Sequence, residues 1–210
     1  MPHNPHVNAA TFIKSAVHQK DYPDTGGLPE IAVAGRSNVG KSSLINTLVN
    51  RRRLAKVSNT PGRTQLLNFF RVDDRFVLCD LPGYGYAKVP TAIKAQWGKM
   101  IETYLERREP LRGLLMLMDA RREPGEFEHA LVAWLSHHGR AVLPVVTKID
   151  KLSPSKRKPA VAAIAKTLGL APRQVVAWSA VTGDGLDVLW RRVVRLTGTE
   201  PAPDGGEPPE

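Results

Sequence analysis

Residues 35–42, with the sequence GRSNVGKS, combine residue types and a spacing that suit phosphate binding. An apolar run at 31–34 precedes this segment, and a helix-like run at 44–48 follows it. Two glycines let the backbone curl so that successive N–H groups point at one anion, and the following helix adds its positive end. We therefore expect Lys41 to reach the terminal phosphates and Ser42 to ligate Mg²⁺. A plain tight turn is the alternative, but the flanking elements favour a phosphate loop.

Three further segments distinguish the class of nucleotide. In residues 80–83 (DLPG), Asp80 is expected to approach the metal through water and the Gly83 N–H to reach a terminal phosphate. In residues 147–150 (TKID), Asp150 can accept two hydrogen bonds from guanine N1–H and the exocyclic amine, a donor pair that adenine lacks. Lys148 is expected to lie across the base, and Ser179–Ala180 to offer an N–H to the guanine oxygen. The set predicts a GTP and GDP site.

Regular alternation of apolar runs and helix-like segments predicts the elements that position these residues. Asp73–Asp74 separates two of the predicted strands and indicates an antiparallel hairpin. The fold class is α/β, a P-loop NTPase fold: a mostly parallel six-stranded sheet with one antiparallel strand and helices on both faces. Strands are predicted at 31–34, 66–72, 75–80, 114–118, 141–147 and 174–177, and helices at 10–17, 41–50, 91–106, 127–136, 154–168 and 184–196. The last helix carries one apolar stripe, formed by Leu186, Leu189, Trp190, Val193 and Val194.

The length of 210 residues suits one domain, which we place at 30–197. Residues 1–29 are expected to form an extension packed on it, and 198–210 a disordered tail rich in acids and proline. Neither a bilayer-spanning apolar segment nor a secretion signal is found, which predicts a cytoplasmic protein. No lipidation signal is found either, so we expect no membrane anchor, and we expect a monomer. Cys79, the only cysteine, lies in an apolar run and is expected to be buried, reduced and inert.

The charge of the chain is unevenly distributed. Its formal net charge is +10, but residues 200–210 hold four acids and no base, so residues 1–199 hold 30 basic against 16 acidic side chains, or +14. Such a field attracts polyanions. For any one cluster, solubility is the better explanation, but the clusters together favour nucleic acid. The clusters are Arg51, Arg52, Arg53 and Lys56; Arg107, Arg108 and Arg112; Lys151, Lys156, Arg157 and Lys158; and Arg191, Arg192 and Arg195.

The chain resembles the EngB family (also called YihA or YsxC) of ribosome-biogenesis GTPases, within the translation-factor class. The resemblance covers nearly everything between residues 10 and 197. It is carried by five motifs in the family's order: GRSNVGKSS at 35–43, TPGRT at 60–64, DLPGYGYA at 80–87, TKID at 147–150 and WSA at 178–180.

The resemblance implies GTP binding with Mg²⁺, GTP hydrolysis and a role in assembling the large ribosomal subunit, with a link to cell division and septation. Lys41, Asn38, Thr64 and Gly83 would serve the reaction, and Ser42, Thr64 and Asp80 the metal. The nucleotide-binding set is Gly35, Arg36, Ser37, Asn38, Val39, Gly40, Lys41, Ser42, Ser43, Gly62, Arg63, Thr64, Asp80, Gly83, Thr147, Lys148, Asp150, Ser179 and Ala180. The implied partners are ribosomal RNA or a precursor of the large subunit.

Two positions, Tyr84 and Thr147, depart from the common GTPase pattern, and a third, Asn38, bears on how hydrolysis is completed. Tyr84 stands where many GTPases keep a water-orienting glutamine, which predicts slow intrinsic hydrolysis. Asn38 is either a potassium ligand, as in several related GTPases, or an asparagine tolerated in a turn. Thr147 replaces the usual asparagine, and its shorter side chain predicts a lost tie to the phosphate loop and micromolar rather than nanomolar affinity, roughly 4 kcal/mol.

Two functions are alternatives to a ribosome-assembly GTPase. One is a regulatory switch whose basic surface binds acidic proteins or anionic lipid at the division site. The other, a P-loop kinase, lacks an arginine-bearing lid insertion and has no use for the guanine motifs.

Overall fold

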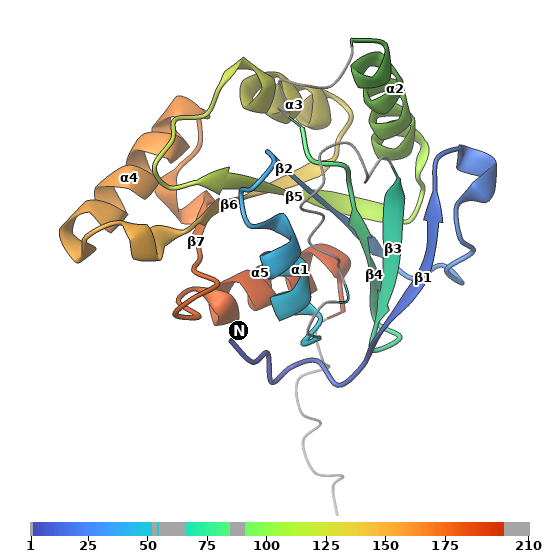
Figure 1. The fold of residues 1–210 in the computed structure, drawn as a ribbon, viewed down its shortest axis with the longest axis horizontal. Helices are drawn as coiled ribbons and strands as arrows, with labels where there is room; N and C mark the ends of the chain where they lie inside the picture. Colours follow the sequence, from blue (N-terminus) through green and yellow to red (C-terminus); the bar gives the residue numbers. More distant parts are fainter. Residues whose placement is uncertain (1, 52–53, 55–65, 85–90, 200–210) are drawn as a thin grey trace, which may run out of the picture.

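A computed structural model of the chain describes residues 2–51, 54, 66–84 and 91–199, of which 91–97 are described as backbone only. The predicted motif at 60–64, with Gly62, Arg63 and Thr64, lies outside these residues, as do Arg52, Arg53, Lys56 and the tail from 200 onward. Figure 1 shows helices packed on both faces of a central sheet. The strands are β1 (Ala10–Ala16), β2 (Glu30–Gly35), β3 (Leu67–Val72), β4 (Phe76–Asp80), β5 (Leu111–Asp119), β6 (Ala141–Thr147) and β7 (Val176–Ala177). The helices are α1 (Lys41–Leu48), α2 (Thr91–Arg107), α3 (Glu126–His137), α4 (Pro154–Thr167) and α5 (Leu186–Thr197).

The described strands form one sheet in the order β1-β3-β4-β2-β5-β6-β7. β4, β2, β5, β6 and β7 pair in parallel, whereas β3 is antiparallel to both of its neighbours. The predicted fold class is therefore confirmed, with β3 as the one antiparallel strand. The strand count of six is wrong, because the sheet has seven strands.

The seventh strand is β1, where we predicted a helix at 10–17. Residues 10–16 pair with β3 from Ala10 opposite Val72 to Ala16 opposite Leu67. An isolated helix of about eight residues is marginal in water, whereas the open edge of β3 supplies this segment with hydrogen-bond partners for its backbone. The branched and aromatic side chains of Thr11, Phe12 and Ile13 also suit a strand. Tertiary pairing decides the outcome.

The hairpin between β3 and β4 forms as predicted. Asp73 and Asp74 both have positive φ, at 46° and 50°, as in a type I′ turn. The register pairs Val72 with Phe76, so three residues join the strands where two were predicted. The Asp73 carboxylate also accepts the backbone N–H of Asn8 at 3.0 Å. The turn thus fastens the segment before β1 to the sheet.

Two apolar cores lie on the two faces of the sheet. Leu44 and Leu48 of α1 pack with Leu189 and Val193 of α5 on one face. On the other face α2, α3 and α4 contribute the residues Leu105, Leu135 and Ile164. The apolar stripe predicted for the last helix is buried, and so is Cys79, which is a free thiol on β4. The predicted burial is confirmed for both. Because helices cover both faces of the sheet, the polar loops lie at the ends of its strands.

A buried polar cluster holds the far end of the sheet, where the parallel strands begin. Glu30, the first residue of β2, is fully buried and forms an ion pair with Arg108 just after α2. Tyr104 donates to the same carboxylate at 3.1 Å, and Arg108 also donates to the Pro23 carbonyl at 2.8 Å. This cluster joins the N-terminal segment, β2 and the end of α2.

Candidate functional site

The phosphate loop joins β2 to α1 as the motif predicts. Gly40 caps α1 at φ 105°, a conformation that side chains rarely adopt. At Gly35 an added Cβ would stand 2.7 Å from the Val39 side chain and 3.0 Å from Leu117, so only glycine fits there. Both glycines are therefore required by the path of the loop, and the N-terminus of α1 opens at its end.

The loop at Asp80–Gly83 lies against the phosphate loop. The Ser37 N–H donates to the Tyr84 carbonyl at 3.0 Å, and the Tyr84 N–H donates to the Gly35 carbonyl at 3.3 Å. A Cβ on Gly83 would stand 3.4 Å from the Ser37 hydroxyl. The predicted phosphate sensor is thus adjacent to the loop that it would serve.

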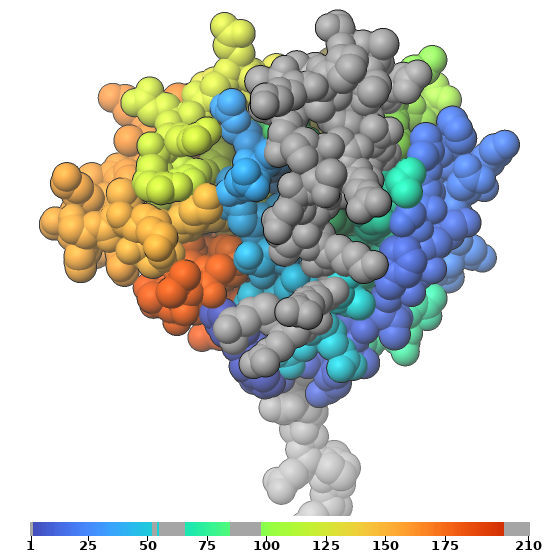
Figure 2. Space-filling view, viewed as in Figure 1, coloured from blue at the N-terminus to red at the C-terminus, as the bar shows by residue number. Residues whose placement is uncertain are grey.

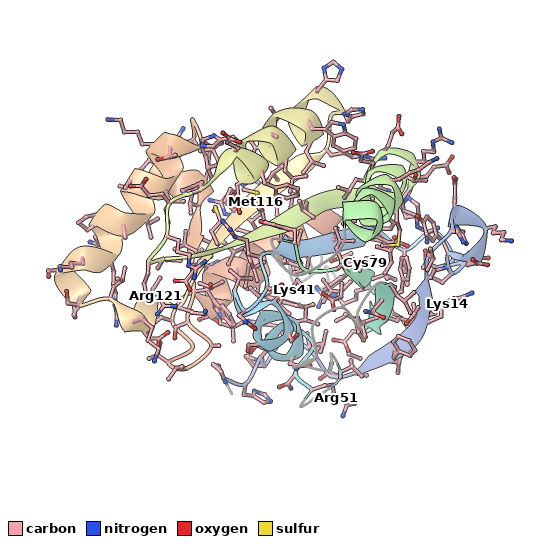
Figure 3. All side chains as sticks on the ribbon, turned by 45° about the horizontal axis from the view of Figure 1, so that its top comes forward. Lys14, Lys41, Arg51, Cys79, Met116 and Arg121 are labelled. Carbon is pink, nitrogen blue, oxygen red and sulfur yellow. The ribbon has the colours of Figure 1, made fainter. Side chains whose placement is uncertain are left out.

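Lys41 and Asp80 form an ion pair at the centre of this arrangement. Their side chains are 13% and 8% exposed, and Figure 3 shows Lys41 deep in the middle of the molecule. Ser42 lies in the same first turn of α1. A hydroxyl and a carboxylate are oxygen ligands of the kind that Mg²⁺ accepts alongside phosphate oxygens. Among the described residues there is no cluster of three or more His, Cys, Asp or Glu that could hold a metal ion.

The predicted base-recognition residues meet at the ends of β6 and β7. Asp150 accepts a hydrogen bond from the Ser179 hydroxyl at 2.7 Å, and Ser179 is fully buried. The Ser179 oxygen in turn accepts the backbone N–H groups of Val181 and Thr182, which fixes its direction. The Ser179 bond lowers the pKa of Asp150 below its ordinary 3.8, against an opposing effect of burial. The carboxylate is therefore ionised and oriented at neutral pH.

Thr147 contradicts the expected loss of a tie between the base loop and the phosphate loop. Its hydroxyl lies 2.7 Å from the Val39 carbonyl and 3.1 Å from the Met118 carbonyl, and it is fully buried. The backbone of β6 brings the shorter side chain close enough to make the contact that an asparagine was expected to provide. The predicted loss of this tie is therefore wrong, so it gives no reason to expect weakened nucleotide affinity.

A second tie comes from Lys148. Its ammonium donates to the Asn38 carbonyl at 2.6 Å and to Asp119 Oδ2 at 3.0 Å. Asn38 has φ 63°, a conformation in which asparagine is enriched, so the turn interpretation of this residue has a direct backbone reason. The base loop is fastened to the phosphate loop at two adjacent carbonyls.

Asp119 and Arg121 are site residues that the sequence analysis missed. Arg121 donates to both carboxylate oxygens of Asp119, at 2.9 and 2.7 Å, and this pairing holds the pKa of Asp119 well below its usual range, with Lys148 assisting. Figure 3 places Arg121 toward the α4 side of Lys41. An acid that ends an apolar strand, as Asp119 ends β5, was the available signal.

Tyr84 points away from the phosphate loop. Its ring centroid lies 4.2 Å from that of Phe127 on α3, and the Glu128 carboxylate is beside its hydroxyl. Burial raises the pKa of the Tyr84 phenol, and Glu128 adds to the rise, so the group is neutral. The residue after the phosphate sensor therefore packs against α3 rather than facing the loop.

Two cavities adjoin these loops. One of about 250 Å³ is lined by phosphate-loop residues 36–39 together with Asp119, Arg121 and Lys148. The other, of about 620 Å³, is largely apolar and lies between α2 and α3, with Gly83, Tyr84 and Trp134 in its wall. The smaller cavity therefore borders the phosphate loop, and the larger one borders the loop at Asp80–Gly83.

The structure therefore brings the described members of the predicted site to one edge of the sheet. Arg36, Ser37 and Val39 lie in the loop between β2 and α1, Ser43 lies in the first turn of α1, and Ala180 follows Ser179 after β7. Gly62, Arg63 and Thr64 remain predictions.

Comparison with known proteins places these features in a family. A family model described as 50S ribosome-binding GTPase matches residues 30–148. A relative from Geobacter metallireducens, named "Probable GTP-binding protein EngB", is 50% identical over 203 residues, covering 96% of this chain and 99% of its own. A second, from Geotalea daltonii and with the same name, is 49% identical over 97% of this chain and 98% of its own.

A solved structure of a probable GTP-binding protein engB has the same fold, with a TM-score of 0.65 over 81% of this chain and 99% of that one at 17% identity. No helix in the described ranges has the length and apolar character to span a membrane.

Proposed function

The chain belongs to the EngB family of GTP-binding proteins, and from this premise we propose that it is a switch that binds GTP and GDP with Mg²⁺ and hydrolyses GTP slowly. The observation that carries the proposal is the double tie between the base loop and the phosphate loop, from Thr147 to Val39 and from Lys148 to Asn38. It holds the base loop beside the phosphate loop, so that Asp150 and Lys41 could bind the two ends of one guanosine nucleotide.

Each residue has a defined part in binding. Lys41 and the N–H groups of residues 37–43 would hold the phosphates, because cations and helix N-termini favour anions. Asp150 would accept from guanine, with Ser179 holding it ionised and Ala180 beside it. Ser42 and Asp80 would hold Mg²⁺, which supplies charge neutralisation at the phosphates when bound. Thr64, Gly62 and Arg63 would close over the terminal phosphate, and Gly83 would sense it.

Hydrolysis is proposed to be slow because position 84 holds a tyrosine, which packs against Phe127, and not a glutamine that could orient the attacking water. A bound potassium ion near Asn38 is proposed to supply the missing positive charge. GTP turnover should then be faster in potassium than in sodium for the wild type and equal in both salts for Asn38→Ala. Equal wild-type rates in the two salts would remove the potassium part of the proposal.

The proposed partner is ribosomal RNA or a precursor of the large ribosomal subunit, in the cytoplasm and with the protein as a monomer. The charge of +14 over residues 1–199 and the description of the matching family model support this partner. A solved structure of Era, 24% identical, contains MgGDPNP and a segment of 16S ribosomal RNA, which concerns Era and offers a parallel. The link to cell division rests on family membership.

Base recognition is tested by Asp150→Asn. An amide donates where the carboxylate accepted, so the variant should lose GTP affinity and gain affinity for xanthosine triphosphate, whose base offers the complementary oxygen. Isothermal titration with both nucleotides measures the exchange. An unchanged preference for GTP would refute the assignment.

The partner is tested by co-sedimentation with 50S particles in GTP and in GDP. Association that is stronger in GTP than in GDP supports the ribosomal switch. Absence of association in both states would favour the alternative, a switch that binds acidic proteins at the division site.

A further inference from the structure

Helix α5 carries a group of arginines on the side turned away from the sheet. Its apolar stripe faces the core, with Leu189 and Val193 fully buried, whereas Arg191 and Arg195 are exposed. Residues four apart lie on one helix face, so these two side chains are neighbours. Arg173 is exposed and lies just before β7. Arg75 lies directly before β4, at the end of the β3–β4 turn. We call Arg75, Arg173, Arg191, Arg192 and Arg195 the arginine face.

The arginine face lacks acidic partners among the described residues. None of the ion pairs between described residues involves a member of this surface; Asp187, four residues before Arg191 on α5, lies 3.9 Å from His6 instead. Two members are instead positioned by backbone carbonyls: Arg192 donates to Arg173 at 2.9 Å, and Arg75 donates to Thr199 at 2.8 Å while stacking over Trp190. Carbonyls orient these guanidiniums without cancelling their charge. Their positive charge is therefore available to an external anion.

We propose that the arginine face binds the phosphate backbone of structured RNA. The proposal rests on the proposed function, because it names the surface by which the switch would hold its RNA partner. Arginine suits this role since its planar fork can pair with two phosphate oxygens at once and remains charged at every physiological pH.

The surface is separate from the nucleotide site. Arg75 precedes β4, whose other end carries Asp80, and Thr199 lies beyond the C-terminal end of α5. The arginine face therefore lies toward the edge of the sheet opposite the phosphate loop. The bound nucleotide should consequently have little effect on this contact, which anchors RNA in both states.

RNA is favoured over a membrane surface by the apolar groups of α5. An interfacial helix inserts an apolar face into lipid, but the apolar stripe of α5 is already buried in the core. On the outer side of α5 the exposed large apolar residue is Val188. A polar, arginine-rich surface without an apolar wedge matches a phosphate backbone instead.

The test compares two variants with the same change in charge. Arg191→Glu/Arg195→Glu alters the arginine face, and Lys156→Glu/Lys158→Glu alters two exposed lysines of a different helix, α4, which Figure 2 shows in orange at the left of the molecule. The probe is a fluorescein-labelled RNA hairpin of defined sequence. Protein bound to GDP or to a non-hydrolysable GTP analogue is titrated into it at several salt concentrations. Nucleotide affinity and melting temperature are measured for every variant.

The arginine variant should lose RNA affinity by roughly tenfold or more, and the slope of log K against log salt should fall by about 1.5 to 2, as expected for two lost phosphate contacts. The loss should be the same with both nucleotides, and GDP affinity should not change. The lysine variant should lose much less. The uncharged variant Arg191→Gln/Arg195→Gln should show an intermediate loss and controls for any folding defect of the glutamates.

Equal losses in the arginine and lysine variants would mean that only net charge matters, and the proposal would be wrong. Wild-type binding to vesicles with 30% anionic lipid, but not to the hairpin, would also overturn it and indicate a membrane partner. If the wild type binds RNA and the arginine variant binds equally well, the surface is wrong while the proposed function stands. If the wild type binds neither RNA nor 50S particles, the proposed ribosomal role fails first.

Discussion

At the scale of single residues, the site depends on hydroxyl groups that hold other groups in place. Thr147 and Ser179 are both fully buried, and each lies within 2.7 Å of a partner that a nucleotide would need, the Val39 carbonyl and the Asp150 carboxylate. A buried hydrogen bond matters mainly through the cost of leaving its partner unsatisfied. Changes at these two positions should therefore affect nucleotide binding without direct contact to the nucleotide.

Thr147→Val keeps the shape of the side chain and removes its hydroxyl. The Val39 carbonyl then loses a donor, which costs about 1–3 kcal/mol, and GDP affinity should fall by roughly tenfold because the phosphate loop loses its tie. Stopped-flow measurement of a fluorescent GDP analogue should show the effect mainly in the dissociation rate. Thr147→Ser retains the hydroxyl and should bind nearly as the wild type does; equal affinity of the valine variant and the wild type would contradict the role of the tie.

Ser179→Ala should change the pH dependence of GDP binding. The Ser179 bond lowers the pKa of Asp150 below 3.8, so the carboxylate needed for guanine is present above that value and is lost only as pH falls through the lower folded-state pKa. Removing the hydroxyl raises the pKa toward its ordinary value, and the acid loss of GDP affinity should begin at a higher pH.

The measurement is GDP affinity from neutral pH downward, over the range in which circular dichroism shows a folded protein. Thr182→Ala, a neighbour that does not touch Asp150, serves as the matched control. Coinciding acid profiles of Ser179→Ala and the wild type would show that the hydroxyl does not set the pKa.

At the scale of elements, the fold is secured at the edge of the sheet opposite the nucleotide site. Glu30 of β2 is fully buried, and Arg108 after α2 is 14% exposed. Arg108 also lies over the rings of Tyr22 and Phe69, at 5.7 and 5.9 Å. A buried charge is costly unless it is paired, so these elements depend on one another.

Arg108→Met should lower the free energy of unfolding by about 3–5 kcal/mol, because it leaves the buried Glu30 carboxylate without its cation. Urea denaturation followed by circular dichroism measures the loss. Arg107→Met, at a neighbouring side chain that is 64% exposed, should cost less than about 0.5 kcal/mol. The double variant Glu30→Gln/Arg108→Met should recover part of the stability, and a double variant no more stable than the single one would argue against an unpaired charge as the cause.

At the scale of the whole molecule, charge is divided between a basic body and an acidic tail. Residues 200–210 contribute four negative charges to a chain whose net charge is +10. Charges of this kind act over about 10 Å at 0.1 M salt, so their influence on a polyanion depends on ionic strength.

Removing residues 200–210 should strengthen binding of the RNA hairpin, by a few-fold at low salt and less as salt is added, because the net charge rises to +14. Fluorescence anisotropy at several salt concentrations provides the comparison. A full-length variant with Glu200→Gln, Asp204→Asn, Glu207→Gln and Glu210→Gln should behave like the truncated chain. If only truncation had an effect, bulk and not charge would be the cause.

The sequence by itself determined the features that depend on local geometry. A phosphate loop needs glycine where the backbone must curl or pack closely, so Gly35 and Gly40 are readable without a structure. The hairpin at Asp73 and the apolar stripe of α5 are likewise local patterns. From β2 onward the order of strands and helices followed from such patterns, and the family from the motifs at the strand ends.

Tertiary structure decided what depends on contacts between distant segments. β1 is a strand because β3 leaves an open edge, and no property of residues 10–16 alone requires it. Thr147 reaches Val39, and Asp119 reaches Lys148, across 108 and 29 positions of the chain. These distances are set by how β2, β5 and β6 lie beside one another in the sheet. A side chain's reach can be read from its type, but its partner is determined only once the backbone has been placed.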